Sequence, residues 1–223
     1  MVSTTTADGP KGRQAQPLLI RLAHWVNVPL LVLMAGSGLQ IFVAYPMLGP
    51  RGALYPWYPL QGSPPPTWLR FGGWLAGARH WHFALAWLLI VNAGVYLVYL
   101  FVRGEWRRRF FLPRRDLKNA VAMVAYYLRI HRTPPPTEFY NGLQRLAYTV
   151  AILLGLIEVL SGLAIYKPLQ LHWLTSIFGG YDGARTVHLL GLVLLALFTA
   201  NHLVLVALHP RTFIDMLTGG KRE

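Results

Sequence analysis

The sequence predicts an all-α membrane protein, a four-transmembrane-helix bundle with a cytoplasmic interfacial helix between helices two and three. Hydrophobic residues make up 54% of the 223 residues and charged residues 13%, against roughly 45–50% and 25% in soluble domains. The charges are also segregated. Asp, Glu, Lys and Arg are absent from residues 22–50, 80–102 and 186–210, and Glu158 alone interrupts residues 146–166. Because about 20 mostly apolar residues cross a bilayer, these segments predict four spans.

The chain divides into a polar tail and one domain with four predicted spans. Residues 1–16 are polar and predict a disordered tail, while residues 17–220 predict one helical domain without an internal repeat. The four predicted spans cover residues 18–44, 77–102, 143–166 and 184–208. The first span is too long for a signal-peptide core and no cleavage site follows it, so we expect it to persist. Pro29 is compatible with this span, because neighbouring groups in a bundle re-satisfy the freed carbonyl.

The connections between the spans differ in character. Residues 45–68 are rich in proline, tryptophan and tyrosine, which is typical of a loop at the outer membrane surface. Residues 112–132 place apolar side chains at helical spacing beside basic residues; the apolar ones are Leu117, Val121, Val124 and Leu128. This pattern predicts an amphipathic helix lying on the cytoplasmic membrane surface.

The net charge of +13 is an orientation signal. Ten of the 21 Lys and Arg residues lie within residues 103–145, three precede the first span and three follow the fourth, whereas the two other loops together hold five. By the positive-inside rule, the N-terminus, the middle loop and the C-terminus are predicted to be cytoplasmic, as in a bacterial inner membrane. The basic excess is expected to face anionic lipid, and no nucleic-acid partner is expected.

Four histidines lie within the spans and form two pairs by depth. His24 and His202 are expected near the cytoplasmic side, and His188 near the outside with His82 or His80. The chain has no cysteine, which excludes disulfides, thiolate zinc sites and protein-ligated iron–sulfur clusters. Any metal or redox chemistry therefore depends on other ligands, and imidazole is an axial ligand to haem iron.

Rotation along the fourth span supports this pairing. His188 and His202 are fourteen residues apart, close to four helical turns, so they share one face and are separated by about 21 Å. Two bis-histidine haems stacked across a bundle need this arrangement. Six glycines near the histidines offer room for the macrocycles or, equally, close helix packing; they are Gly36, Gly38, Gly94, Gly155, Gly162 and Gly191. Alternatively, each histidine is an isolated polar residue bonded to a neighbouring helix.

The remaining histidines are weaker candidates. His80 and His82 lie about 200° apart on a helix, so they cannot serve the same site. We favour His82, since small and apolar residues follow it into the span, while His80 is expected to face the loop. His131, His172 and His209 lie in predicted surface regions.

The chain resembles the four-helix di-haem cytochrome b subunits of formate dehydrogenase, nickel–iron hydrogenase and thiosulfate reductase. Four stretches carry the resemblance: "RLAHW", "HF", "YNGLQRLAY" and "VHLLG…NHLVL…MLTG", within about residues 17–220. The resemblance implies two haem b groups ligated by the two histidine pairs, the inner His24/His202 and the outer His82/His188. It also implies a quinone site formed by Asn141 and Gln144. The alternative is that these amide side chains cap the start of a helix.

Arginines near the histidines are candidates for haem propionates or are ordinary interfacial anchors. They are Arg21, Arg145 and Arg211 on the inner side and Arg79 and Arg185 on the outer side. Glu158 has no counterpart in the resemblance. An ionisable residue inside a span is a functional candidate, so it is predicted to be either a proton relay or a hydrogen-bonded acid.

The leading functional hypothesis is a respiratory electron carrier between the quinone pool and a catalytic redox subunit on the outer face. The "TPPPTEFYNGLQ" segment resembles cytochromes that partner molybdopterin oxidoreductases. One alternative is a stand-alone quinone reductase acting on a small outer-surface substrate such as superoxide. Another is a haem-free histidine-based transporter of metal ions or protons, for which broken helices and more midplane carboxylates are expected.

Overall fold

The computed structural model describes residues 16–136 and 140–220, and these residues form helices and no strands. Four helices are long and apolar enough to cross a membrane: α1 (Leu18–Phe42), α2 (Leu75–Val102), α5 (Gly142–Tyr166) and α7 (Tyr181–Leu208). Their ends lie within three residues of the four predicted spans, so the prediction of four candidate spans is confirmed. Apart from Gln16, the predicted tail over residues 1–16 lies outside the described residues.

Five shorter elements connect or follow the spans. They are the 3-10 helix η1 (Thr67–Leu69), α3 (Trp106–Arg109), α4 (Pro113–Tyr127), α6 (His172–Ile177) and α8 (Pro210–Thr218). The amphipathic segment predicted over residues 112–132 is the helix α4, which ends five residues earlier than expected. The sequence analysis did not predict the other four, because they are too short or too close to a span to carry a separate hydrophobic period.

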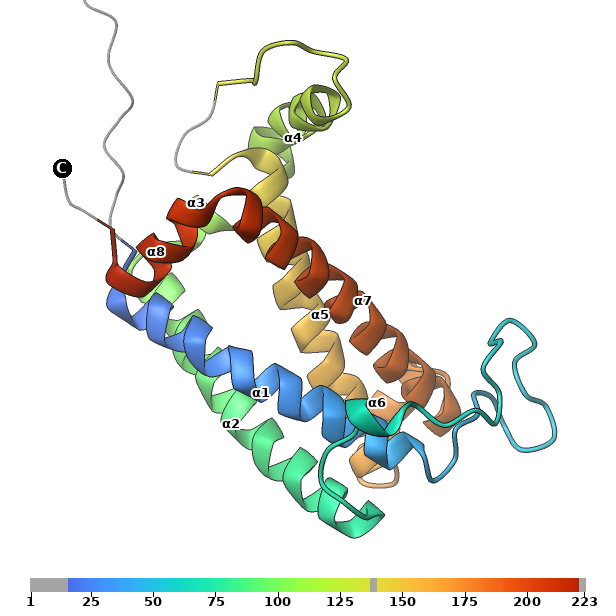
Figure 1. Ribbon diagram of the computed structural model, residues 1–223. Helices are drawn as coiled ribbons and strands as arrows, with labels where there is room; N and C mark the ends of the chain where they lie inside the picture. The colour runs from blue at the N-terminus through green and yellow to red at the C-terminus, as the bar shows by residue number, and fades with distance from the viewer. Residues whose placement is uncertain (1–15, 137–139, 221–223) are drawn as a thin grey trace, which may run out of the picture.

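The long helices associate in two pairs, α1 with α2 and α5 with α7 (Figure 1). Each apolar span keeps most of its surface outside the protein core, since at most 17% of its most apolar window is buried. Outward-facing apolar surface of this extent suits a lipid environment. Inside the first pair, Asn92 Nδ2 on α2 donates to Ala23 O at 2.9 Å and to Asn27 Oδ1 at 2.7 Å on α1.

The N-terminal end of α1 and the C-terminal helix α8 lie at the same end of the bundle, beside α3 and α4 (Figure 1). Backbone and side-chain hydrogen bonds hold them together. Gln16 N donates to Gly219 O at 2.8 Å, and Trp25 Nε1 donates to Met216 O at 3.2 Å. The long loop over residues 43–74 and α6 lie at the opposite end. Both chain ends of the helical region are therefore on one side, as four spans require.

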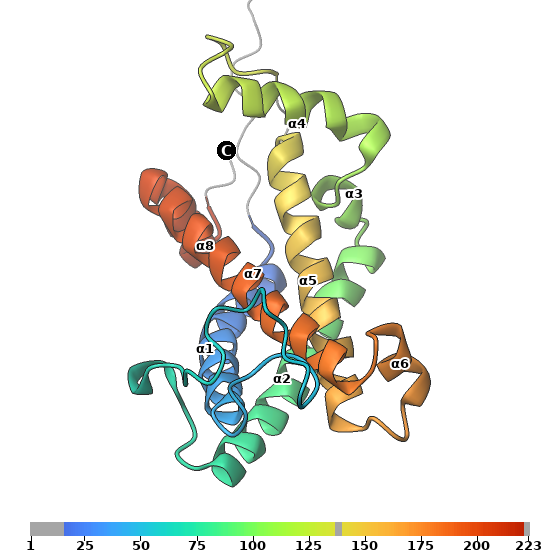
Figure 2. The same ribbon diagram turned by 90° about the vertical axis from the view of Figure 1, so that its right-hand side faces the viewer.

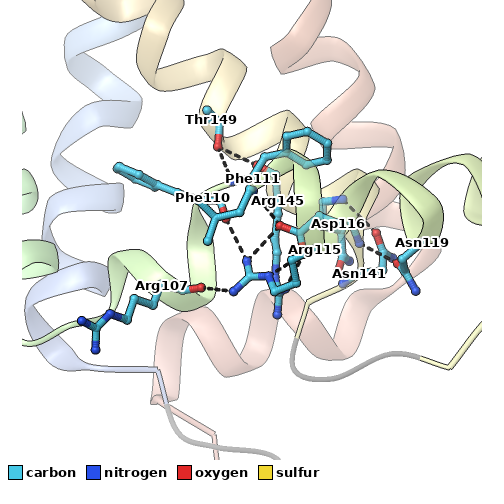
Figure 3. A network of polar contacts seen from close by, with 12 residues as sticks. Arg107, Phe110, Phe111, Arg115, Asp116, Asn119, Asn141, Arg145 and Thr149 are labelled. Atoms are coloured by element: carbon cyan, nitrogen blue, oxygen red, sulfur yellow. Dashed lines mark hydrogen bonds and ion pairs between the residues drawn. The ribbon is translucent and has the colours of Figure 1, made fainter.

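Helix α4 lies across the end of α5 (Figure 2) and is fixed there by a buried polar network (Figure 3). The Asp116 carboxylate accepts from Leu112 N at 2.8 Å, from Arg115 Nε at 2.7 Å and from Arg145 Nη1 at 2.8 Å. Burial alone would raise the pKa of Asp116, but hydrogen bonds from Arg115, Leu112 and Arg145 outweigh it and lower the pKa to about 2. The network therefore ties α4, the first turn of α5 and the preceding loop into one unit.

The other face of α4 is apolar and uncovered in the described part of the chain. Leu117, Val121, Val124 and Leu128 are all exposed there, whereas Ala120 and Met123 are buried. An exposed apolar stripe on an amphipathic helix fits a membrane surface, but the position of α4 relative to a bilayer stays a prediction.

Replacing Asp116 with Asn is expected to lower the free energy of unfolding by about 3 kcal/mol, because the buried Arg145 guanidinium loses its counter-ion,. The measurement is thermal or denaturant unfolding of the detergent-solubilised chain. Because the folded-state pKa of Asp116 lies near 2, below the ordinary value of about 3.9, the stabilisation is complete above about pH 4 and is lost as the pH falls through 2.

The matched control is Asp182→Asn, whose ion pair with Arg185 is longer, at 3.7 Å, and more exposed. This control is expected to change stability by less than about 1 kcal/mol. A stability difference between the Asp116 variant and the unmodified chain that persists undiminished at pH 2 would contradict the assignment.

Candidate cofactor site

The structure brings four span histidines together as two facing pairs. His82 on α2 faces His188 on α7 with ring centroids 6.2 Å apart and planes at 76°. His24 on α1 faces His202 on α7, also with centroids 6.2 Å apart, and planes at 59°. Each pair therefore joins the α1–α2 pair of helices to α7, and the two pairs are the ones expected from depth.

The spacing of the rings fits two imidazoles on opposite sides of one metal ion. A metal–nitrogen bond of about 2 Å, with each nitrogen about 1 Å from its ring centroid, places two such centroids about 6 Å apart. Both histidine pairs have this separation. Direct hydrogen bonding between two imidazoles would also satisfy their nitrogens, but it does not explain two pairs of equal spacing at two depths.

Serine hydroxyls fix the tautomer of the outer pair. Ser37 Oγ on α1 lies 3.0 Å from His82 Nδ1, and Ser161 Oγ on α5 lies 3.0 Å from His188 Nδ1. Each hydroxyl donates its single proton to a backbone carbonyl of its own helix, Ser37 to Met34 O at 3.1 Å and Ser161 to Ile157 O at 2.7 Å. The serine oxygens therefore accept from Nδ1–H, which leaves Nε2 of both rings with a free lone pair for a metal.

The sequence analysis missed Ser37 and Ser161, although a signal was present. Both serines begin the tripeptide Ser-Gly-Leu, at residues 37–39 and 161–163. A Cβ on Gly38 would lie 3.3 Å from His82 Cε1, and one on Gly162 would lie 3.2 Å from His188 Cε1. In each tripeptide the serine contacts Nδ1 of a histidine ring, and the glycine, which lacks a side chain, lets the ring edge approach. The same short sequence therefore packs against one histidine in each half of the chain.

The inner pair has different surroundings. His24 Nδ1 is buried and has no hydrogen-bond partner among the described residues. Its ring meets Trp25 edge to face at 5.1 Å, and His202 stacks on Phe198 with planes at 6°. The rings of the inner pair therefore pack against aromatic side chains, whereas the rings of the outer pair contact serine hydroxyls.

The remaining histidines are exposed: His80, His131, His172 and His209. Two of them bond locally, His209 Nδ1 to Leu205 O at 3.0 Å and His172 Nδ1 to Ser176 Oγ at 3.4 Å. His82 rather than His80 faces His188, so the geometry favours the ligand that we chose.

The six glycines divide into different roles. Among the described residues, nothing lies within 4 Å of a Cβ built on Gly94 or Gly155, so these two glycines pack against no neighbouring helix. Gly36 packs against Phe71 of the outer loop, and a methyl group on Gly191 would overlap the carboxyl group of Glu158. Close packing, one of the two alternatives for these glycines, therefore describes Gly36 and Gly191.

Two of the arginines predicted as propionate partners have protein partners in the structure. The Arg145 guanidinium is buried against Asp116 at 2.8 Å, so the nearest carboxylate to it belongs to α4. Arg21 donates to the carbonyl oxygens of Met216 and Leu217 at the end of α8. Both guanidinium groups therefore help to fix one end of the bundle, and their contact with haem propionates stays a prediction.

For the other three arginines, the role as a haem propionate partner also stays a prediction. Arg185 Nη2 donates to Tyr45 O at 2.8 Å and to Met47 O at 3.3 Å, which fixes α7 to the outer loop and leaves further N–H donors. Arg79 lies over the Phe83 ring at 5.9 Å, and Arg211 is exposed.

Asn141 and Gln144 form a capping box at the start of α5. Asn141 Oδ1 accepts from Gln144 N at 2.8 Å, and Gln144 Oε1 accepts from Asn141 N at 3.1 Å. The cap that was the alternative to quinone binding is thus present. It uses the amide oxygens, whereas a quinone carbonyl would use the amide N–H donors, so the quinone role stays a prediction.

Taken together, the fold and the site define a class: an α-helical membrane protein whose paired histidines are spaced for a metal cofactor. The family model described as prokaryotic cytochrome b561 matches residues 15–219, and the chain belongs to this family. Family membership implies that the chain binds haem b. It confirms the prediction of a membrane cytochrome b, while the particular enzyme that the cytochrome serves stays a prediction.

One relative is the putative protein-methionine-sulfoxide reductase subunit YedZ1 of Azospira oryzae. It is 36% identical over 203 residues, which cover 91% of this chain and 95% of the relative. No solved structure matches the chain significantly.

Replacing Ser37 or Ser161 with Ala is expected to lower haem retention by about 10–100-fold, the usual cost of removing a hydrogen-bond partner of a ligating histidine. Haem content per chain after purification measures it. Ser176→Ala is the matched control, since Ser176 contacts the exposed His172. Equal haem content in all three variants would contradict the role of the two buried serines.

Proposed function

We propose that the chain is a di-haem b-type cytochrome that carries electrons across the membrane between a quinone and a redox partner subunit. The observation that carries the proposal is the presence of two facing imidazole pairs, both with centroids 6.2 Å apart. When bound, haem supplies one-electron chemistry, and the protein supplies ligands, spacing and dielectric.

The proposed ligands are His82 with His188 at the outer site and His24 with His202 at the inner site. His188 and His202 share the helix α7, whose rise places them about 21 Å apart along its axis. One rigid element therefore sets the spacing of the two sites. At the outer site, Ser37 and Ser161 contact Nδ1 of each ring and so leave Nε2 free to serve as the ligand atom.

We place the inner site and the chain ends on the cytoplasmic side of a bacterial inner membrane. The basic loops support this orientation,, and the shared location of the start of α1 with α3, α4 and α8 at one end of the bundle supports it further. In this orientation the apolar stripe of α4 rests on lipid, and the start of α5 lies at the inner boundary. Asn141 and Gln144 there offer amide N–H donors to a quinone carbonyl.

The partner is proposed to be a catalytic subunit on the outer face, of the molybdopterin oxidoreductase type. The relative from Azospira oryzae is named as a subunit of a reductase, which supports a division between a membrane cytochrome and a separate catalytic chain. In residues 16–136 and 140–220, no three His, Asp or Glu side chains gather as ligands for a bare metal ion. This disfavours the metal-transport alternative.

Each histidine pair is expected to hold one haem, so His188→Ala and His202→Ala should each lose one of two haems. The loss follows because an alanine cannot replace the axial nitrogen. Reduced-minus-oxidised spectra and haem counts measure it, with His80→Ala and His209→Ala as exposed controls that keep both. A chain without b-type bands, despite haem supply during expression, would rule out the proposal.

Asn141→Ser separates the capping role from the quinone role, because serine caps a helix as well as asparagine does but has no amide N–H. We expect unchanged thermal stability and several-fold slower reduction of the haems by added quinol. Asn119→Ser, in the adjacent α4–α5 contact, is the control. If quinol reduces the haems of the variant at the unmodified rate, the quinone role of Asn141 is contradicted and only its role as a helix cap remains.

A further inference from the structure

Glu158 is an acidic side chain inside the span α5, away from the basic residues at the span ends. Its carboxyl Oε2 lies 3.0 Å from His188 Nδ1, and its side chain is 16% exposed. Ser161, one turn later on the same face of α5, reaches the same nitrogen at 3.0 Å. The Nδ1–H of His188 therefore has two oxygen acceptors, a hydroxyl and a carboxyl group.

The backbone of α7 makes room for this carboxyl group. Gly191 is buried and lies one turn after His188, and a methyl group there would overlap Glu158 Oε1. The glycine thus admits the side chain of Glu158 between the two helices. An acidic side chain that a neighbouring helix accommodates in this way is part of the packing of the site, not a residue directed to lipid.

The three described Nδ1 environments differ in the strength of the acceptor. His188 Nδ1 contacts a carboxyl oxygen and a hydroxyl, and His82 Nδ1 contacts the Ser37 hydroxyl at 3.0 Å. His24 Nδ1 has no partner among the described residues. An acceptor on Nδ1–H raises the basicity of the opposite ring nitrogen, so the ligand nitrogens of His188 and His82 are more basic than that of His24, and His188 has the strongest acceptor.

We propose that Glu158 is a positioning residue for His188 that lowers the reduction potential of the outer haem relative to the inner one. The inference rests on the proposed haem ligation. A more basic axial nitrogen stabilises the ferric state more than the ferrous state, and hydrogen bonding around the axial ligand is one of the ways in which a protein sets a haem potential. Glu158 acts through His188 and itself touches no substrate.

The test is a redox titration of the haem-loaded full chain in detergent, followed through its b-type absorption bands. Glu158→Gln keeps the size of the side chain and replaces the carboxyl group with a weaker acceptor. We expect the midpoint potential of one haem to rise while that of the other stays unchanged, with both haems retained. The ferric low-spin resonance of the same haem is expected to shift in the electron paramagnetic spectrum.

Two further variants separate the outcomes. Gly191→Ala displaces the carboxyl group without changing its chemistry and is expected to raise the same potential, whereas Thr199→Val removes an exposed hydroxyl bonded to Leu195 O on α7 and is expected to change neither. If Glu158→Gln loses haem, Gly191→Ala decides the inference.

Unchanged or lowered potentials in Glu158→Gln and Gly191→Ala, with two haems bound, would overturn the inference and leave the proposed function intact. Retention of both haems by His188→Ala would instead overturn the proposed function.

Discussion

A histidine inside a bilayer brings two ring nitrogens into a medium that offers them no water, and this constraint organises the centre of the molecule. An unsatisfied polar group in such surroundings costs several kcal/mol. At the outer pair, Ser37 and Ser161 satisfy the Nδ1 atoms, and this leaves the Nε2 atoms as the donors that a metal needs. The serines in turn pass their protons to carbonyls of their own helices. Each hydrogen bond thus determines the direction of the next one, from backbone to serine to imidazole to ligand position.

The ends of the bundle use a different set of interactions. At the α4 end, Asp116 neutralises Arg115 and Arg145, and Gly142 allows close contact because a Cβ there would lie 2.5 Å from Asp116 O. At the opposite end, Arg185 binds carbonyl oxygens of the loop after α1. Apart from Glu158, the ionic contacts in the described part of the chain thus lie at the two ends of the bundle, where the desolvation of charge costs least,. Glycine, serine and histidine are left to build the interior.

The spans and the histidine pairs were predictable because they depend on one-dimensional quantities. Gaps in charge mark the spans, and position within a span gives depth, so His82 and His188 are matched before any contact is known. The sequence patterns do not show which face of a helix turns toward its neighbour. Ser37 and Ser161 are ordinary small residues until α1 is known to pack on α2 and α5 on α7. For the same reason the ion pair between Arg145 and Asp116 was not predicted, since nothing in the sequence indicates that α4 packs on the start of α5.

Because α7 carries one histidine of each pair, the geometries of the two pairs are coupled. A helix is stiff along its axis, so a displacement that changes the distance between His188 and His82 also changes that between His202 and His24. The opposing ligands sit on α1 and α2, which Asn92 joins through Ala23 O and Asn27 Oδ1. Both ligand distances therefore depend on one rigid helix and one cross-linked pair of helices. At its outer end Arg185 holds α7 to the loop that follows α1. At its inner end α8 binds the start of α1 through Trp25. The rise of α7 sets the separation of its two histidines at about 21 Å, and the contacts at both ends of α7 fix its position relative to α1 and the loop after it.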